Sequence, residues 1–194
     1  MLDFLARNPE ATAAIASAVL TALALFAGWR SNRKSELRRE DVLDWANESI
    51  TVLQSVRLIT SSARTQLTEE QAVARLGQLV FETSILVERG RLFFRNTRDG
   101  AHGKDKPHAY RGRRPVILDQ LVLAHQIACA WPGADASRRK AMALVAEDVL
   151  RRFVSLVQME VGRVRTASAD TRRRGDGQDL NGRIADLDPA RLPG

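Results

Sequence analysis

Apolar side chains recur every three or four residues along four stretches of this chain, which is the period of an amphipathic helix. The stretches cover residues 35–66, 68–94, 115–131 and 135–164. Four such helices, joined by two short connections and one long loop, predict an all-α fold built as an antiparallel four-helix bundle. The expected core positions, in chain order, are Val42, Ala46, Ile50, Leu53, Val56 and Ile59; Ala72, Leu76, Leu79, Val80, Thr83, Leu86 and Val87; Leu118, Leu121, Val122, His125 and Cys129; and Met142, Val145, Val149, Phe153, Leu156, Val157, Val161 and Val164.

Short polar and proline signals mark where these helices begin. Thr68 followed by Gln71 has the spacing of a capping box, in which each side chain bonds to the backbone N–H of the other residue. Pro115 suits the first position of the third helix, because its missing N–H has no partner there in any case. Asp135 or Ser137 is expected to cap the fourth helix.

A different pattern precedes the bundle, since residues 11–29 hold no charged side chain. At about 1.5 Å per residue these nineteen residues just reach across a hydrocarbon layer of about 30 Å. Basic residues follow the segment within 30–39, so the positive-inside rule predicts an extracytoplasmic stretch 1–10, a transmembrane helix 11–29 and a cytoplasmic bundle 30–165. A cleaved signal peptide, a buried helix and an interfacial helix are the competing interpretations. The localisation predicted is the bacterial inner membrane, N-terminus out and C-terminus in.

Composition adds partners and a tail to this picture. The net charge of +7 indicates an anionic partner, such as a phospholipid surface, a nucleic acid or an acidic protein. In the predicted topology the basic clusters within 30–39, 95–114 and 163–174 lie at the bundle end that faces the membrane. Small residues at Ala14, Ala18 and Ala22 favour a homo-oligomer. Residues 166–194 are poor in apolar side chains and have no period, which predicts a disordered tail.

The long loop, residues 95–114, concentrates the candidate site residues. Its glycines Gly100, Gly103 and Gly112 permit backbone angles that other residues avoid, so that the loop could surround a phosphate. The alternative is a solvated or lipid-facing loop. The predicted anion-binding residues are Arg95, Arg98, Lys104, Lys106, Arg111, Arg113 and Arg114, with Tyr110 as a stacking residue.

Other chemically active side chains have simpler explanations. His102 and His108 stand in no standard zinc spacing, so we expect no metal and no cofactor. His125 and Cys129 have the spacing of half a metal site or an activated thiol, but they continue the apolar stripe of their helix, which favours core packing. Asp119 is explained by its place near a helix N-terminus. An enzyme built on the three histidines and the cysteine remains the rival hypothesis.

The letters GRLFF-N of residues 90–96 and KPHAYRGRRPVILD of residues 106–119 resemble a pattern of small bacterial proteins with one N-terminal membrane helix. The resemblance covers about thirty residues and carries no activity, so it transfers no functional residue. The expected function is interaction, as a membrane-anchored scaffold, sensor or effector with a possible protein partner. The alternative is a module that responds to nucleic acid or nucleotides through loop 95–114 and is coupled to a membrane effector.

Overall fold

The computed structural model describes residues 9–61, 67–97, 100, 102–161 and 175–191, with side chains at all of these except 9–16, 27 and 30–35. The described chain is helical, and its only β pairing is an isolated bridge between Thr97 and Arg113. It divides into two units, residues 1–41 and 42–194. The longer helices are α2 (Pro9–Thr60), α3 (Glu69–Phe93), α4 (Val116–Ala130) and α5 (Ala136–Val161), followed by the short α6 (Leu180–Ala185).

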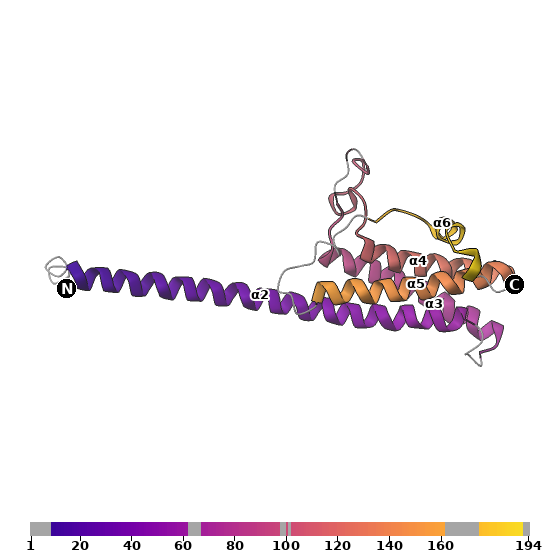
Figure 1. Cartoon of the computed structure of the whole chain (residues 1–194), viewed down its shortest axis with the longest axis horizontal. Coiled ribbons are helices and arrows are strands. Elements are labelled where there is room, and N and C mark those ends of the chain that lie inside the picture. The colour runs from indigo at the N-terminus through magenta and orange to yellow at the C-terminus, as the bar shows by residue number, and fades with distance from the viewer. Residues whose placement is uncertain (1–8, 62–66, 98–99, 101, 162–174, 192–194) are drawn as a thin grey trace. The chain divides into compact units, whose positions relative to one another are not determined.

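The second unit is the helical bundle that the sequence predicts. It contains α2 from Val42 onward together with α3, α4 and α5, which run side by side (Figure 1). Helix α4 packs against both α3 and α5. The apolar stripes of the four helices supply a common core, as expected from their period.

The prediction of a transmembrane helix over residues 11–29 is wrong on this structure. Among the residues with described side chains, no helix is apolar over enough of its length to cross a membrane. The helix that holds this stretch, α2, continues without a break through the charged residues Glu36, Arg38 and Arg39. The predictions of an inner-membrane localisation and of its orientation are wrong on the same finding.

Parts of that prediction fall outside the described residues. These parts are residues 1–8, the side chains of 9–16, with Ala14 among them, and the side chains of 30–35. The basic cluster 163–174 also lies outside the described chain.

Trp45 of α2 forms the centre of the core and is fully buried. Its indole Nε1 donates a hydrogen bond of 2.9 Å to the carbonyl oxygen of Leu86 on α3, which satisfies the one polar atom of the ring. The rings of Phe94 and Phe153 lie 5.3 Å and 5.6 Å from the Trp45 ring, centroid to centroid. One tryptophan therefore joins α2, the end of α3 and α5.

Local signals set the helix boundaries as predicted, with one shift. Both hydrogen bonds of the Thr68–Gln71 capping box are present. Asp135 is the residue that caps α5, because its Oδ1 accepts a hydrogen bond of 2.8 Å from the backbone N–H of Arg138. Pro115 is the N-cap residue of α4, so the helix begins at Val116, one residue later than predicted.

The prediction of a disordered tail over 166–194 is wrong for residues 175–191, while 166–174 and 192–194 lie outside the described chain. Leu180 is buried, and its backbone N–H donates a 2.8 Å hydrogen bond to Oε1 of Gln126 on α4. Arg191 forms two hydrogen bonds with the carboxylate of Asp148 on α5. A few well-placed contacts thus fix a segment whose composition is mostly polar, and α6 packs on α5 and α4 (Figure 1).

Candidate anion-binding site

The loop between α3 and α4 is folded, although its sequence has no period. The backbone N–H groups of Thr97 and Arg113 each donate to the carbonyl oxygen of the other residue, at 2.9 Å in both directions. Further out, the N–H of Gly112 donates to the carbonyl oxygen of His102 at 3.1 Å. These bonds join the two arms of the loop, which extends away from the bundle (Figure 1), and a short 3₁₀ turn, η1 (His108–Tyr110), follows on the returning arm.

The three loop glycines adopt the backbone conformation for which the sequence suggested them. Gly100, Gly103 and Gly112 have φ angles of 50°, 67° and 84°. Only glycine enters this region at low cost, so the tight path of the loop depends on these positions.

Tyr110 attaches the loop to α3. Its hydroxyl donates a 2.8 Å hydrogen bond to Oε2 of Glu88, and the guanidinium of Arg91 lies over the ring, 4.6 Å from its centroid. Arg91 also pairs with Oε1 of Glu88 at 3.1 Å. The hydrogen bond to the Glu88 carboxylate raises the pKa of Tyr110, since losing the phenolic proton would remove the bond. One face of the predicted stacking residue is therefore occupied by a cation of the same chain.

The predicted cations divide into two groups. Arg95, Lys104, Lys106 and Arg111 are exposed, and the backbone carbonyl of Lys106 accepts a 2.8 Å hydrogen bond from Nε of Arg111. Arg113 and Arg114 are half-buried at the base of the loop, where Arg113 faces the carbonyl oxygen of Asp176 and Arg114 faces the carboxylate of Asp119. Arg98 lies outside the described residues.

A network of opposite charges holds the base of the loop against the C-terminal segment. Arg114 Nε lies 3.3 Å from Oδ1 of Asp119 on α4, and the carbonyl of Arg114 accepts a 3.1 Å hydrogen bond from the N–H of Gly175. Asp176 in turn pairs with Arg183 at 2.6 Å. Arg113 Nη1 also lies 3.5 Å from the carbonyl oxygen of Asp176, so both arginines contact groups of their own chain at the base of the loop.

Asp119 is the most perturbed acid among the described residues. Burial raises its pKa to about 6, against the lowering effect of nearby Arg114, and the charge of Asp176 raises it further. The sequence argument from the helix dipole did not anticipate this, because Gly175, which closely approaches the Asp119 carboxyl, lies more than fifty residues later in the chain.

The expectation that Cys129 belongs to the core is wrong, because its side chain is exposed at the end of α4. Its Sγ lies 3.7 Å from Nε2 of His125, whose Nδ1 is 3.2 Å from the carbonyl oxygen of Val80 and 3.1 Å from Oγ1 of Thr83. The Val80 carbonyl can only accept, so Nδ1 carries the proton and Nε2 faces the thiol. Partial burial raises the pKa of the thiol, which makes it a poor nucleophile at neutral pH.

His102, His108 and His125 belong to no metal centre within the described part of the chain. No three side chains of the His, Cys, Asp or Glu type come together there in a way that could hold a metal ion.

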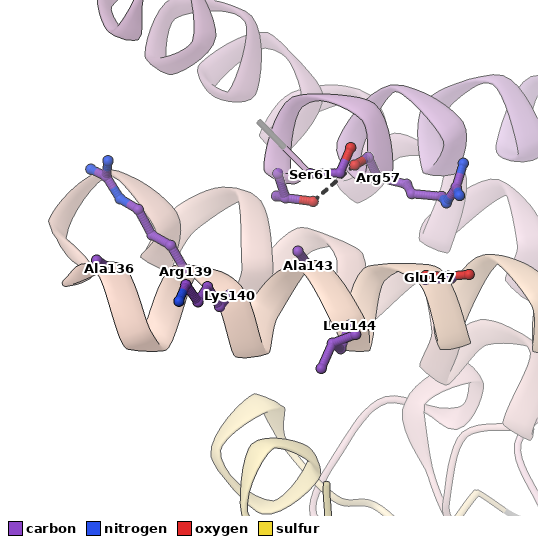
Figure 2. Close-up of a pocket in the computed structure, with 9 residues that line it drawn as sticks. Arg57, Ser61, Ala136, Arg139, Lys140, Ala143, Leu144 and Glu147 are labelled. Carbon is purple, nitrogen blue, oxygen red and sulfur yellow. Dashed lines mark hydrogen bonds between the residues drawn. The ribbon is translucent and has the colours of Figure 1, made fainter. Parts of the chain in front are cut away.

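The sequence analysis did not single out a cavity of about 560 Å³ between the end of α2 and the start of α5. Its lining includes the cations Arg57, Arg139 and Lys140 and the acid Glu147. Figure 2 shows the guanidinium groups of Arg57 and Arg139 at opposite ends of the cavity. Arg139 already stacks on Trp131 at 4.0 Å and pairs with a glutamate of α3, so these cations do not converge on one anion.

Comparison with known proteins adds no relative to this description. No protein family model, no curated protein and no solved structure matches the chain.

Proposed function

We propose that this protein is a helical interaction module that binds phosphate groups of a partner molecule through loop 95–114. The observation that carries the proposal is the display of Arg95, Lys104, Lys106 and Arg111 on a loop whose backbone is bonded across its arms. Asp105 is the one acid among the described residues of 100–114, against the exposed cations Lys104, Lys106 and Arg111, so this part of the loop carries a net positive charge.

The attachment of the loop supports binding on energetic grounds. When binding must order a loose loop, the entropy cost of ordering lowers the affinity. The hydrogen bonds of Tyr110 and Thr97 already fix this loop, so binding to it carries a smaller entropy cost. Cations that contact phosphates release counterions, so binding by this loop should weaken steeply with added salt. Pre-ordering of the loop and salt-dependent binding do not require the loop to catalyse a reaction.

The experiment measures binding of the full-length chain to a fluorescein-labelled single-stranded oligonucleotide by anisotropy. Replacing two exposed loop cations, Lys104→Glu with Lys106→Glu, should weaken binding by about tenfold or more and flatten its salt dependence. The matched control makes the same change of charge away from the loop, on α5, with Lys140→Glu and Arg151→Glu. The control should bind within about threefold of the natural chain.

Competition experiments identify which chemical group the loop recognises. Inorganic polyphosphate should displace the oligonucleotide if phosphates alone are bound, and vesicles of anionic phospholipid present the same group on a surface. Equal losses in the loop variant and the control would mean that only net charge matters, and would contradict the proposal. Undiminished binding by the loop variant would contradict it equally.

A further inference from the structure

Helix α3 carries an apolar stripe that the bundle does not cover. The stripe consists of Ala74, Gly77, Phe81, Ile85 and Leu92, which share one face because an α-helix turns by about 100° per residue. The side chains of Phe81, Ile85 and Leu92 are 72%, 58% and 80% exposed. Three large apolar side chains in one line on a surface indicate a contact with another molecule.

The core of the bundle does not explain the stripe. The opposite face of α3 supplies the core residues Leu76, Leu79, Thr83 and Leu86. The stripe itself has no charged residue between Glu70 at its start and Glu88 near its end, a length of more than four helical turns. A Cβ atom built on Gly77 would meet nothing within 4 Å, so this part of the surface is open to a close neighbour.

We propose that a second copy of this chain covers the stripe, with the two α3 helices packed antiparallel. The sizes of the side chains favour this partner and this direction, because the small residues Ala74 and Gly77 lie at one end of the stripe and the large Leu92 lies at the other. Antiparallel packing places Leu92 of each copy over Ala74 and Gly77 of the other, and Phe81 of each against Ile85 of the other. Parallel packing would place Leu92 against Leu92 and set Ala74 and Gly77 against the same small residues of the other copy, which leaves a gap at that end.

The charges at the two ends of α3 favour the same arrangement. The first turn is acidic, with Glu69 and Glu70, and the last turn contains Arg91, with the exposed Arg95 just beyond it. Glu69 is already paired with Arg139, whereas Glu70 is exposed on the stripe face. An antiparallel pair brings Glu70 of one copy to Arg95 of the other, and does so twice by symmetry.

A groove beside the stripe provides room for the central contact. It encloses about 330 Å³ between α2 and α3, and Ile85, Leu86 and Val52 form its apolar wall. The ion pair of Glu48 with Arg89 borders it. In the proposed register the Phe81 ring of the second copy lies at the opening of this groove, next to Ile85.

Cysteine cross-linking of the full-length chain tests the register directly. Cys129→Ser first removes the exposed natural thiol. In this background, Ala74→Cys is introduced in one variant and Leu92→Cys in a second variant that carries a different tag. Mild oxidation of the mixture should give a disulfide between the two tags. Each variant alone should give almost none, because like positions in an antiparallel pair are about 27 Å apart at 1.5 Å per residue.

Sedimentation then measures the strength of the contact. Phe81→Glu with Ile85→Glu should raise the dissociation constant of the dimer by about tenfold or more, since each change places a charge in an apolar contact. Both residues are exposed, so helicity measured by circular dichroism should not change. Met159→Glu on α5, also an exposed apolar residue, is the control and should leave the dimer intact.

Three results would overturn the proposal. They are a natural chain that sediments as a monomer at micromolar concentration, cross-linking of each cysteine variant with itself in place of the mixture, and a Phe81, Ile85 variant that associates as the natural chain does.

Discussion

The hydroxyl of Tyr110 donates a 2.8 Å hydrogen bond to Oε2 of Glu88, twenty-two residues earlier in the chain, and this contact fixes the basic loop to α3. Arg91 completes the contact by covering one face of the tyrosine ring while it pairs with Glu88. A loop that composition alone would describe as solvated is thereby given one position relative to the bundle.

Removing this attachment should loosen the loop without unfolding the bundle. Tyr110→Phe keeps the ring under Arg91 and loses only the hydrogen bond, whereas Tyr110→Ala loses both contacts. Hydrogen exchange of the Gly112 and Arg113 amides should accelerate in the first variant and more strongly in the second. Exchange as slow in the alanine variant as in the natural chain would show that the backbone bonds alone fix the loop.

Close packing of α2 against α3 depends on Gly90. A Cβ atom at this position would lie 2.4 Å from Cδ2 of Leu118 and 2.8 Å from Cζ2 of Trp45. Leu118 can rotate, but the Trp45 ring is held by its hydrogen bond to Leu86. Gly90→Ala should therefore lower the free energy of unfolding by about 1–3 kcal/mol, measured by urea denaturation.

Gly77 of the same helix is the matched control. No atom lies within 4 Å of a Cβ built there, so Gly77→Ala should stabilise the chain by about 0.5–1 kcal/mol through helix propensity. The measurement is made at low protein concentration, where self-association is minimal. Equal effects of the two substitutions would contradict the packing argument.

The pH dependence of stability should report the burial of Asp119. Its pKa is about 6 in the folded chain, above the ordinary value of 3.8, so between these two pH values the folded state holds more protons than the unfolded state. The free energy of unfolding therefore falls as the pH rises through this window, by on the order of 1–3 kcal/mol from this group.

Asp119→Asn should remove that contribution. The variant should match the natural chain near pH 4 and exceed it in stability at pH 7 by on the order of 1–3 kcal/mol, because it carries no charge to bury. Urea denaturation across the pH range measures the difference. A natural chain that is the more stable at pH 7 would show that the ion pair with Arg114 outweighs burial.

The C-terminal segment should detach when Gly175 is enlarged. A Cβ atom at residue 175 would lie 1.6 Å from Oδ2 of Asp119 and 3.2 Å from the carbonyl oxygen of Arg114, so the segment cannot keep its place. Gly175→Ala should expose Leu180 and accelerate proteolysis of residues 175–191 at protease concentrations that leave the natural chain intact.

Gly182→Ala on α6 is the control for this change. Its nearest atoms lie at the ordinary contact distance of 3.6 Å, so the segment should remain docked and resist the protease. If the Gly175 variant resists the protease as well as the control does, the contacts of Leu180 and Arg191 hold the segment in place without the close approach of Gly175 to Asp119.

Features that depend on neighbouring residues could be predicted, and those that depend on distant ones could not. The Thr68–Gln71 box lies within four consecutive residues, so its hydrogen bonds follow from the spacing. Cys129 continues an apolar stripe in sequence, yet its side chain is exposed at the end of α4, and the period does not show where along a helix the packing against a neighbour stops. The sequence predicts anion binding by Arg113 and Arg114, but it does not show that Arg114 pairs with Asp119 or that Arg113 lies 3.5 Å from the carbonyl oxygen of Asp176, sixty-three residues later.

The sequence alone determined the secondary structure of the bundle, because helix period, capping and proline placement act over one or two turns. It also determined the charge of loop 95–114. Only the tertiary structure decided that this loop is folded, that residues 175–191 pack on α4 and α5, and that one apolar face of α3 is left uncovered. These outcomes depend on contacts between residues that are tens of positions apart in the chain. A local pattern shows which positions are apolar and favour burial, but it does not show which segment packs against them.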